Sequence, residues 1–283
     1  MRMFGKLLLK QNNTRGSALI TALFIVTIVA ITATAMSVRL QMDIYRTQLS
    51  SDHQSDYLKA QAFDSYSVAL LKRDDLPKLP YAFNAKTIGL TDISGTATLE
   101  DAQAKYNLNN LATADAIPSF IQLLIVLDPS LSEHSALAIA EQLHHRIAQQ
   151  HLPFVLPQEV LEIKVIPTPL ASKLIQHVTA LPSETPLNIN TASATVLRTL
   201  GAGLTAQQAQ LLIDARKQLN QDSVLDQLKI PEKQITVLSD YYLSTISIEN
   251  DPGQKSLQLL SLYKRNRIEE HPIIVHKIYH VIR

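Results

Sequence analysis

The chain contains no cysteine and no tryptophan. Without cysteine there is no disulfide framework, no thiol nucleophile and no cysteine metal site. The absence of cysteine is compatible with both a reducing and an oxidising compartment. An excess of charge of one sign is also missing: 26 lysines and arginines face 25 acidic residues, and the formal net charge of +1 gives no overall attraction to nucleic acid or to an acidic partner. The sequence has no glycine-rich phosphate loop, no H-E-x-x-H motif and no recognisable nucleophile motif, so we expect no enzyme.

One stretch is long and apolar enough to span a bilayer. The run from Ser17 to Val38 carries no charged side chain. As a helix it would measure about 33 Å, against a hydrocarbon core of about 30 Å. Basic residues precede it (Arg2, Lys6, Lys10 and Arg15), so the positive-inside rule places the N-terminus in the cytoplasm. On charge and length alone, the signal anchor of an ordinary single-pass protein fits this pattern equally well.

The junction Arg15-Gly16-Ser17 lies before this apolar run. A secretory signal peptide is cut after its apolar core, whereas a cut after Gly16 would leave the helix on the mature protein. This order of parts resembles the type IV prepilin family, which includes the pseudopilins of type II secretion. The resemblance implies that a prepilin peptidase cuts between Gly16 and Ser17 and methylates the new amino group of Ser17.

The rest of the chain changes its pattern twice. The helical pattern continues to Arg73, and the stretch Gly95–Asn109 has the partial alternation of a strand or a strand pair. Proline-separated helical stretches then run from about residue 112 to residue 238, including a helix over Pro231–Ser239. Three further strands with short links favour an antiparallel meander: Tyr241–Glu249, Ser256–Lys264 and Pro272–Ile282.

These elements predict an α+β fold. A long N-terminal helix, transmembrane and then amphipathic, packs on an antiparallel pilin-like sheet, and a large all-α domain is inserted between strands of that sheet. The predicted parts are a leader peptide (1–16), the N-terminal helix (17–73, with 17–38 in the membrane), a pilin-like α/β domain (74–111 and 239–283) and the inserted domain (112–238).

Position 21 departs from the common prepilin pattern. Most family members have glutamate at the fifth mature position, where it neutralises the N-terminal amine of a neighbouring subunit, and this chain has Thr21. A carboxylate left unpaired in a lipid-like core costs several kcal/mol. A subunit with no neighbour above it has no amine to pair, so Thr21 favours a tip subunit. Among pseudopilins this absence resembles the K type.

Two short motifs carry the resemblance to the K type further. Members of that type have D-x-x-x-K-x-N-L-N before the insert and N-x-N-T-A within it. The matching residues here are Asp101, Lys105, Asn107, Leu108 and Asn109, followed by Asn188, Ile189, Asn190, Thr191 and Ala192. We interpret them as structural. Asn190 or Thr191 would cap a helix that starts near Ala192, and Asn188 would hold a loop by bonding its own backbone.

The resemblance implies a minor pseudopilin that caps the pseudopilus tip, initiates its assembly and supports protein export across the outer membrane. Its implied partners are the minor pseudopilins of the I and J types, the major pseudopilin fibre, the prepilin peptidase and the inner membrane, with the C-terminal bulk in the periplasm and no nucleic acid. No cofactor is required. Some K-type pseudopilins bind calcium in the inserted domain, so calcium enters here through the resemblance alone. No stretch of this sequence matches an EF-hand loop, and the sequence itself does not show such a site. A tip minor pilin of a type IV pilus fits the same features.

A membrane-anchored DNA-binding protein is the alternative from another class. The stretch Leu187–Arg216 resembles a helix-hairpin-helix with Gly201-Ala202-Gly203 as its hairpin, and the hairpin amides of such modules hold a DNA phosphate. Phosphate affinity is mostly electrostatic, however, and Gly203 to Ile213 contains no lysine or arginine. We therefore interpret it as a packing motif. Glu141 and His145, with His144 and His151 nearby, are interpreted as a solvated helix surface, and no metal ligand is assigned.

Replacing Gly16 by a bulky residue should leave the precursor uncut, because the peptidase requires glycine before the cut. Mass spectrometry of the N-terminal residue and of its methylation reports the outcome. Normal maturation of that variant would refute the cleavage site.

Overall fold

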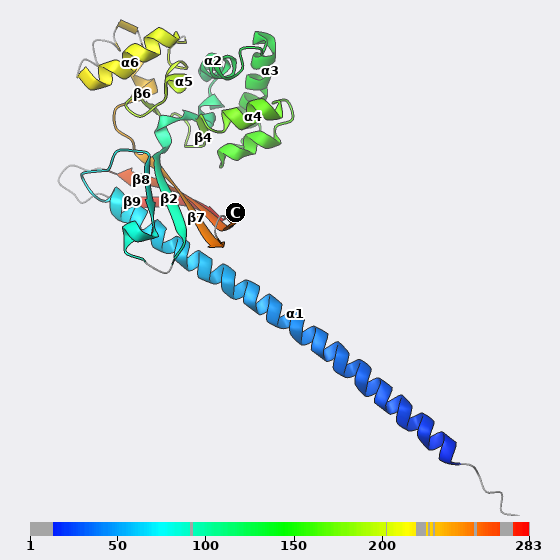
Figure 1. The fold of residues 1–283 in the computed structure, drawn as a ribbon. Coiled ribbons are helices and arrows are strands. Elements are labelled where there is room, and N and C mark those ends of the chain that lie inside the picture. Colours follow the sequence, from blue (N-terminus) through cyan, green and yellow to red (C-terminus); the bar gives the residue numbers. More distant parts are fainter. Residues whose placement is uncertain are drawn as a thin grey trace, which may run out of the picture. The chain divides into compact units, whose positions relative to one another are not determined.

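The computed structural model describes residues 14–90, 93–201, 203–218, 225, 227–228, 230–251, 254–266 and 274–282 (Figure 1). The chain forms two compact units, Met1–Asp56 and Tyr57–Arg283. Helix α1 (Thr14–Leu71) contributes to both units.

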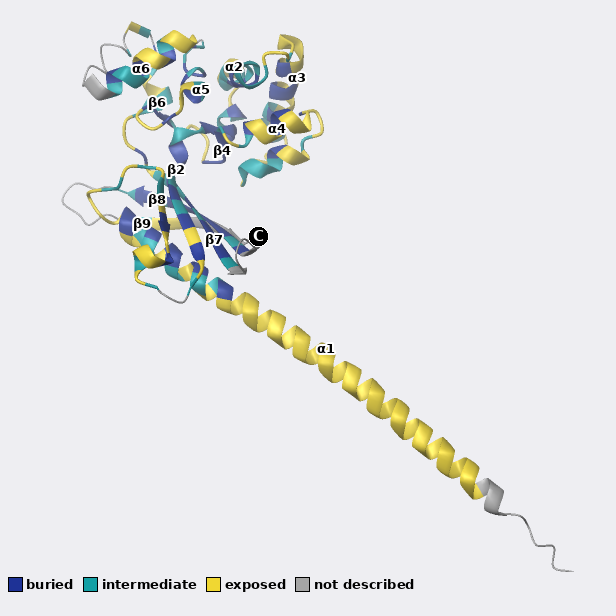
Figure 2. Ribbon diagram, viewed as in Figure 1, coloured by how far each residue is buried: buried dark blue, intermediate teal, exposed yellow. Residues whose placement is uncertain are grey.

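In the first unit, the surface of α1 is exposed, apolar from Ala18 to Val38 and mixed with charged side chains such as Arg39 and Asp43 beyond it. Every side chain from Ala18 to Ser55 is exposed, including large ones such as Leu19 and Phe24 (Figure 2). The hydroxyl group of Thr27 donates to the carbonyl oxygen of Leu23 at 2.8 Å, and Thr32 and Thr34 bond one turn back in the same way. Such bonds satisfy hydroxyl groups in an apolar environment. Within the described residues, α1 is the helix that is long and apolar enough to cross a membrane.

The second unit contains a five-stranded sheet in the order β1-β2-β7-β8-β9, with all neighbours antiparallel. Its strands are β1 (Tyr81–Asn84), β2 (Gly95–Asp101), β7 (Tyr241–Asp251), β8 (Gln254–Asn266) and β9 (Ile274–Ile282). The predicted meander of the last three strands is confirmed. Strand β1 was not predicted, because four residues after a proline carry little alternation.

The end of α1 packs on one face of this sheet. Ala60, Phe63 and Leu71 are fully buried there among strand residues that include Ile246 and Tyr263. Helical spacing on α1 and alternation on the strands therefore present two apolar surfaces to each other.

Polar groups cross the same interface. The Oγ atoms of Ser67 and Ser244 are 2.9 Å apart, and Asp64 accepts from the hydroxyl group of Tyr263 and from Lys277 Nζ. Burial raises the pKa of Tyr263, and the adjacent Asp64 raises it further. The hydroxyl group of Tyr263 therefore stays protonated and acts as a donor.

The insert occupies the chain between β2 and β7. Its helices include α2 (Ile117–Leu127), α3 (Glu133–His144), α4 (Thr168–Leu174), α5 (Ala194–Leu197) and α6 (Ala206–Gln218). Two short parallel ladders accompany them, β3 (Tyr106–Asn107) with β4 (Val178–Thr179) and β5 (Leu187–Asn188) with β6 (Ile235–Thr236). Ser132 and Thr205 cap the starts of α3 and α6, because Ser132 Oγ accepts from Ser135 N at 3.1 Å and Thr205 Oγ1 from Gln208 N at 3.2 Å.

The structure corrects the predicted start of the insert. The strand expected over Gly95–Asn109 ends at Asp101, because the side chain of Asp101 accepts from the amide of Gln103 and begins a 3₁₀ turn. Tyr106, Leu108 and Leu111 then pack into the core of the insert. Residues 106–111, predicted to lie with the sheet, therefore pack with the insert.

The structure also corrects two element ends. No α-helix forms over Pro231–Ser239 among the described residues of that stretch: a 3₁₀ turn (Glu232–Gln234) leads into β6, because Ile235 and Thr236 pair with β5. Helix α1 ends at Leu71 rather than Arg73. Arg265 of β8 is fully buried there and donates to the carbonyl oxygens of Leu71 (Nε, 2.8 Å) and Arg73 (NH2, 2.6 Å). A cation at a helix C-terminus also favours the helix dipole.

Arg265→Met should lower the free energy of unfolding by about 2–4 kcal/mol, because it leaves buried carbonyl groups without a donor. Lys264→Met is the control: this neighbouring cation is partly exposed, and its loss should cost less than about 1 kcal/mol. Urea unfolding of the full chain in detergent micelles, followed by circular dichroism, measures both. Equal losses would contradict the capping role of Arg265.

Candidate functional site

The two predicted motifs meet where the insert leaves and rejoins the sheet. Asp101 ends β2, and Asn188 ends β5. Asn188 Nδ2 donates to Asp101 Oδ2 at 2.9 Å and to Ser239 Oγ at 2.8 Å. The hydroxyl group of Thr191 donates to the same Asp101 oxygen. We call Asp101, Gln103, Asn188, Thr191 and Ser239 the junction cluster.

Asp101 is the charged centre of the junction cluster, with only 4% of its surface exposed. Burial raises the pKa of its carboxyl group, and hydrogen bonds from Ser239, Thr191, Gln103 and Asn188 oppose part of that rise. Its Oδ1 accepts from Gln103 N at 2.8 Å, while Oδ2 accepts the side-chain donors of the insert. One carboxylate thus joins the start of the insert to its second half.

Gln103 completes this link, and the motifs did not predict it. Its Nε2 donates to the carbonyl oxygen of Pro186 at 2.9 Å, and its Oε1 accepts from the amides of Asp240 (2.6 Å) and Tyr241 (3.2 Å). It therefore bonds the chain that enters β7. Ser239 was missed as well. Neither residue follows a sequence pattern, because their partners lie far along the chain.

Asn107 and Asn109 hold the first half of the insert together. Asn107 Oδ1 accepts from Leu181 N at 2.9 Å, and its Nδ2 donates to the carbonyl oxygen of Pro182 at 2.8 Å. Asn109 bonds the backbone of Phe154 with both ends of its carboxamide. Both side chains are buried. They supply the hydrogen bonds that water would otherwise give to backbone groups of the loops, which pair with no strand.

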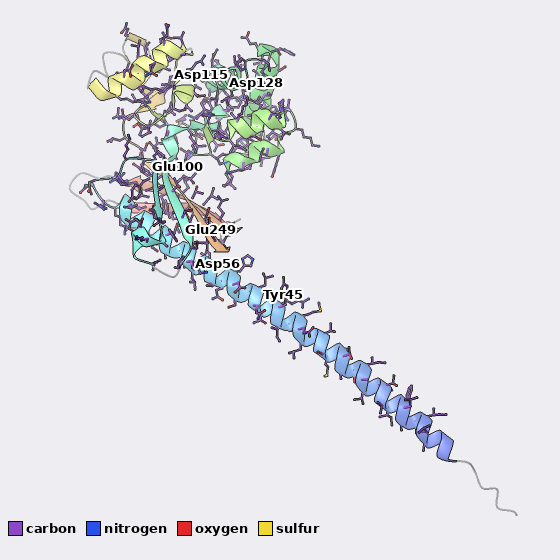
Figure 3. The ribbon with its side chains drawn as sticks, in the orientation of Figure 1. Tyr45, Asp56, Glu100, Asp115, Asp128 and Glu249 are labelled. Carbon is purple, nitrogen blue, oxygen red and sulfur yellow. The ribbon has the colours of Figure 1, made fainter. Side chains whose placement is uncertain are left out.

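Lys105 lies apart from these bonds. Its Nζ is 2.8 Å from Glu100 Oε2, and each side chain keeps about a third of its surface exposed. Figure 3 shows Glu100 where β2 meets the insert. The structure therefore gives Lys105 an ion pair, whereas the other residues of its motif form buried hydrogen bonds.

The structure divides the roles predicted for the second motif. Asn188 Oδ1 accepts from Asn190 N at 2.9 Å, so the predicted bond to its own backbone is confirmed. The predicted cap is wrong, because α5 begins at Ala194 and its cap is Ser193, whose Oγ accepts from Val196 N. Asn190 Nδ2 donates to the carbonyl oxygen of Val237 at 2.9 Å instead.

The hairpin between α5 and α6 is tied to the rest of the insert. The amide of Gly201 donates to Gln234 Oε1 at 3.2 Å. Gly201 and Gly203 have φ values of 60° and 96°, which favour glycine; Ala202 lies outside the described residues. Arg198 and Arg216 each donate to backbone carbonyl groups of the insert. These bonds agree with the packing interpretation of the hairpin.

The histidine-rich stretch does not form a cluster of ligands. In the part of the chain that the structure describes, no three histidine or acidic side chains come close enough to hold a metal ion. His144 Nδ1 lies 2.7 Å from the carbonyl oxygen of Leu111, while Glu141, His145 and His151 are exposed. Calcium binding stays a prediction from resemblance.

The residues of the predicted cleavage site lie at the start of α1. The backbone of Gly16 and Ser17 is helical, and most of the leader, residues 1–13, lies outside the described residues. The hydroxyl group of Thr21 donates to the carbonyl oxygen of Ala18 at 3.0 Å. Position 21 thus carries a neutral side chain that bonds within its own helix.

Asp101→Asn should destabilise the chain by about 1–3 kcal/mol, because an NH₂ group would face donors that now bond a carboxylate. The control is Asp115→Asn, at an exposed position, with an expected change within about 0.5 kcal/mol. Thermal unfolding by circular dichroism measures the difference. Equal stability of the two variants would show that the carboxylate does not hold the junction.

Comparisons with known proteins agree with this architecture. Residues 187–241 match the family model described as type II secretion system (T2SS), protein K. No curated protein matches the chain in sequence. A chain in the crystal structure of the GspK-GspI-GspJ complex from the enterotoxigenic Escherichia coli type 2 secretion system is similar at a TM-score of 0.59 and 22% identity. The match covers 84% of this chain and 99% of that chain.

The family match lies on the part of the insert that contains Asn188, Asn190 and the hairpin. The structural match extends over most of the chain and shows a shared fold. The match over residues 187–241 therefore confirms the predicted resemblance to protein K of type II secretion systems.

Proposed function

We propose that this chain is a K-type minor pseudopilin that caps the tip of a type II secretion pseudopilus and initiates its assembly. The observation that carries this proposal is the protein K match within an insert that interrupts an antiparallel sheet between β2 and β7. The similarity to a chain of the GspK-GspI-GspJ complex supports it through the fold. Its role is structural, with no catalysis.

The part of α1 in the first unit is suited to a membrane anchor that later packs against other subunits. Its exposed apolar side chains suit either lipid or neighbouring helices, since both environments remove them from water. We propose that the protein crosses the inner membrane once, with its C-terminal bulk in the periplasm, after cleavage behind Gly16. Minor pseudopilins of the I and J types would then pack along α1. The major pseudopilins would form the fibre beneath these tip subunits.

Thr21 supports a position at the tip. A glutamate there needs the amine of a neighbouring subunit, and an unpaired carboxylate in an apolar core is costly. Thr21 instead bonds within its own helix. A subunit placed first, with none above it, can therefore assemble without an unpaired charge. The bulk of the insert would leave no room above it for another subunit.

Thr21→Glu should disturb tip placement more than membrane insertion, because the new carboxylate has no amine to neutralise. Thr21→Gln is the matched control, with a similar shape and no charge. Secretion of a reporter substrate and co-purification of I-type and J-type subunits measure assembly, and membrane fractionation measures insertion. If the glutamate variant assembles and secretes like the glutamine variant, the tip argument fails.

A further inference from the structure

Helix α1 continues beyond the predicted membrane span, and this part of it is not purely polar. The span ends at Val38, and residues 39–55 follow as helix with every side chain exposed (Figure 2). At 1.5 Å per residue they extend about 25 Å past the span. The large apolar side chains exposed there are Leu40, Met42, Ile44, Tyr45 and Leu49. Apolar surface on an element that stands in water marks an interaction site.

Three of these side chains continue a row that begins inside the membrane span. Val38, Met42, Tyr45 and Leu49 follow one another at spacings of 4, 3 and 4 residues, which places them on one face of the helix (Figure 3 labels Tyr45). Each keeps between 48% and 67% of its surface exposed. We call these four residues the heptad seam, because two helices pack knobs into holes at this spacing. The residues that precede them at the same spacing are Phe24, Ile28, Ile31 and Ala35.

The charged side chains lie along one edge of the heptad seam. Arg39 and Arg46 directly follow Val38 and Tyr45, so the two arginines share an edge. The carboxylate of Asp43 lies one turn from each, yet among the described residues neither arginine forms an ion pair. Charges beside such a seam set the choice of partner. A partner helix would therefore meet two cations that need carboxylates.

Asp52 takes the next position of the row, three residues after Leu49, and it is exposed. A charged group at a core position is costly unless the partner neutralises it, and it fixes the register of the pair. The partner must therefore bring a lysine or an arginine to this end of the seam.

A second copy of this chain does not fit these requirements. Parallel pairing in register would set Asp52 against its own equivalent and would place Arg46 beside the neutral Gln41. Lipid does not fit either, because Asp43 and Asp52 would be costly in an apolar phase. The seam therefore suits a helix of a different protein. Because the row begins inside the membrane span, that helix enters the same membrane and runs parallel to α1.

We propose that the heptad seam binds one parallel helix of another protein, which carries carboxylates along the edge facing Arg39 and Arg46 and a cation opposite Asp52. This inference rests on the proposed function, in which I-type and J-type subunits pack along α1. It assigns one of these subunits to a single face of the helix and gives the charge pattern that selects it.

The first test maps the contact in the full chain, co-expressed with the I-type and J-type subunits. The photo-crosslinker p-benzoylphenylalanine is placed at Met42, Tyr45 or Leu49, and at Thr47 or Ser51 as matched exposed controls. The seam positions should all crosslink to the N-terminal helix of the same subunit, which mass spectrometry of the adduct identifies. The controls should crosslink to that subunit about fivefold less, because opposite faces of a helix have different neighbours.

The second test reverses the charges beside the seam. Arg39→Glu combined with Arg46→Glu should lower co-purification of that subunit about tenfold, because two attractive pairs become repulsive. Lys72→Glu combined with Lys78→Glu reverses as many charges at exposed positions outside the seam, and it should change co-purification less than about twofold. Salt at about 1 M should remove most of the difference between the two variants. Membrane fractionation confirms that both are inserted.

Four results would overturn the proposal: seam adducts with lipid, seam adducts with a second copy of this chain, an adduct with a helix that lacks the carboxylates, or equal co-purification of the two charge variants. If either subunit still crosslinks elsewhere along α1, the proposed tip function stands without the seam. If neither subunit crosslinks at any position of α1, the proposed function fails together with it.

Discussion

Strands β2 and β7 exchange hydrogen bonds as sheet neighbours although the whole insert separates them in sequence. The register pairs Asp101 with Tyr242 at the end where the insert begins. The segment that leaves β2 and the segment that enters β7 must therefore lie side by side, and their buried polar groups need hydrogen-bond partners within the protein. The carboxylate of Asp101 and the carboxamide of Gln103 do this. The attachment of the insert to the sheet depends on this small set of buried hydrogen bonds.

Helix α1 meets two different requirements along its length. From Ala18 to Ser55 its side chains are exposed, and no other described segment covers them. From Tyr57 onward it packs on the sheet, and Asp64, Ser67 and the Arg265 cap fix its position there. A helix that is buried only at one end is suited to a protein that anchors and then assembles through the other end. This division is the physical basis of the proposed role as a pseudopilin.

The same link between sheet and insert leaves a groove between them, lined by residues of the insert and of β7 and β8. Because the insert returns to β7 beside its point of departure, one of its walls faces the outer side chains of β7 and β8. The junction cluster holds this link through its internal hydrogen bonds.

The sequence by itself determined the apolar anchor, the glycine before it, the strand meander and the helical character of the insert, because these follow from charge, hydropathy and periodicity over neighbouring residues. It also placed the motif asparagines in structural roles. Only the tertiary structure decided which groups they bond. Asn188 and Asp101 are separated by 87 residues, and no spacing rule relates such partners. The cap at Ser193, the pairing of β6 with β5, the role of Gln103 and the groove likewise arise from contacts between distant segments, which local patterns do not encode.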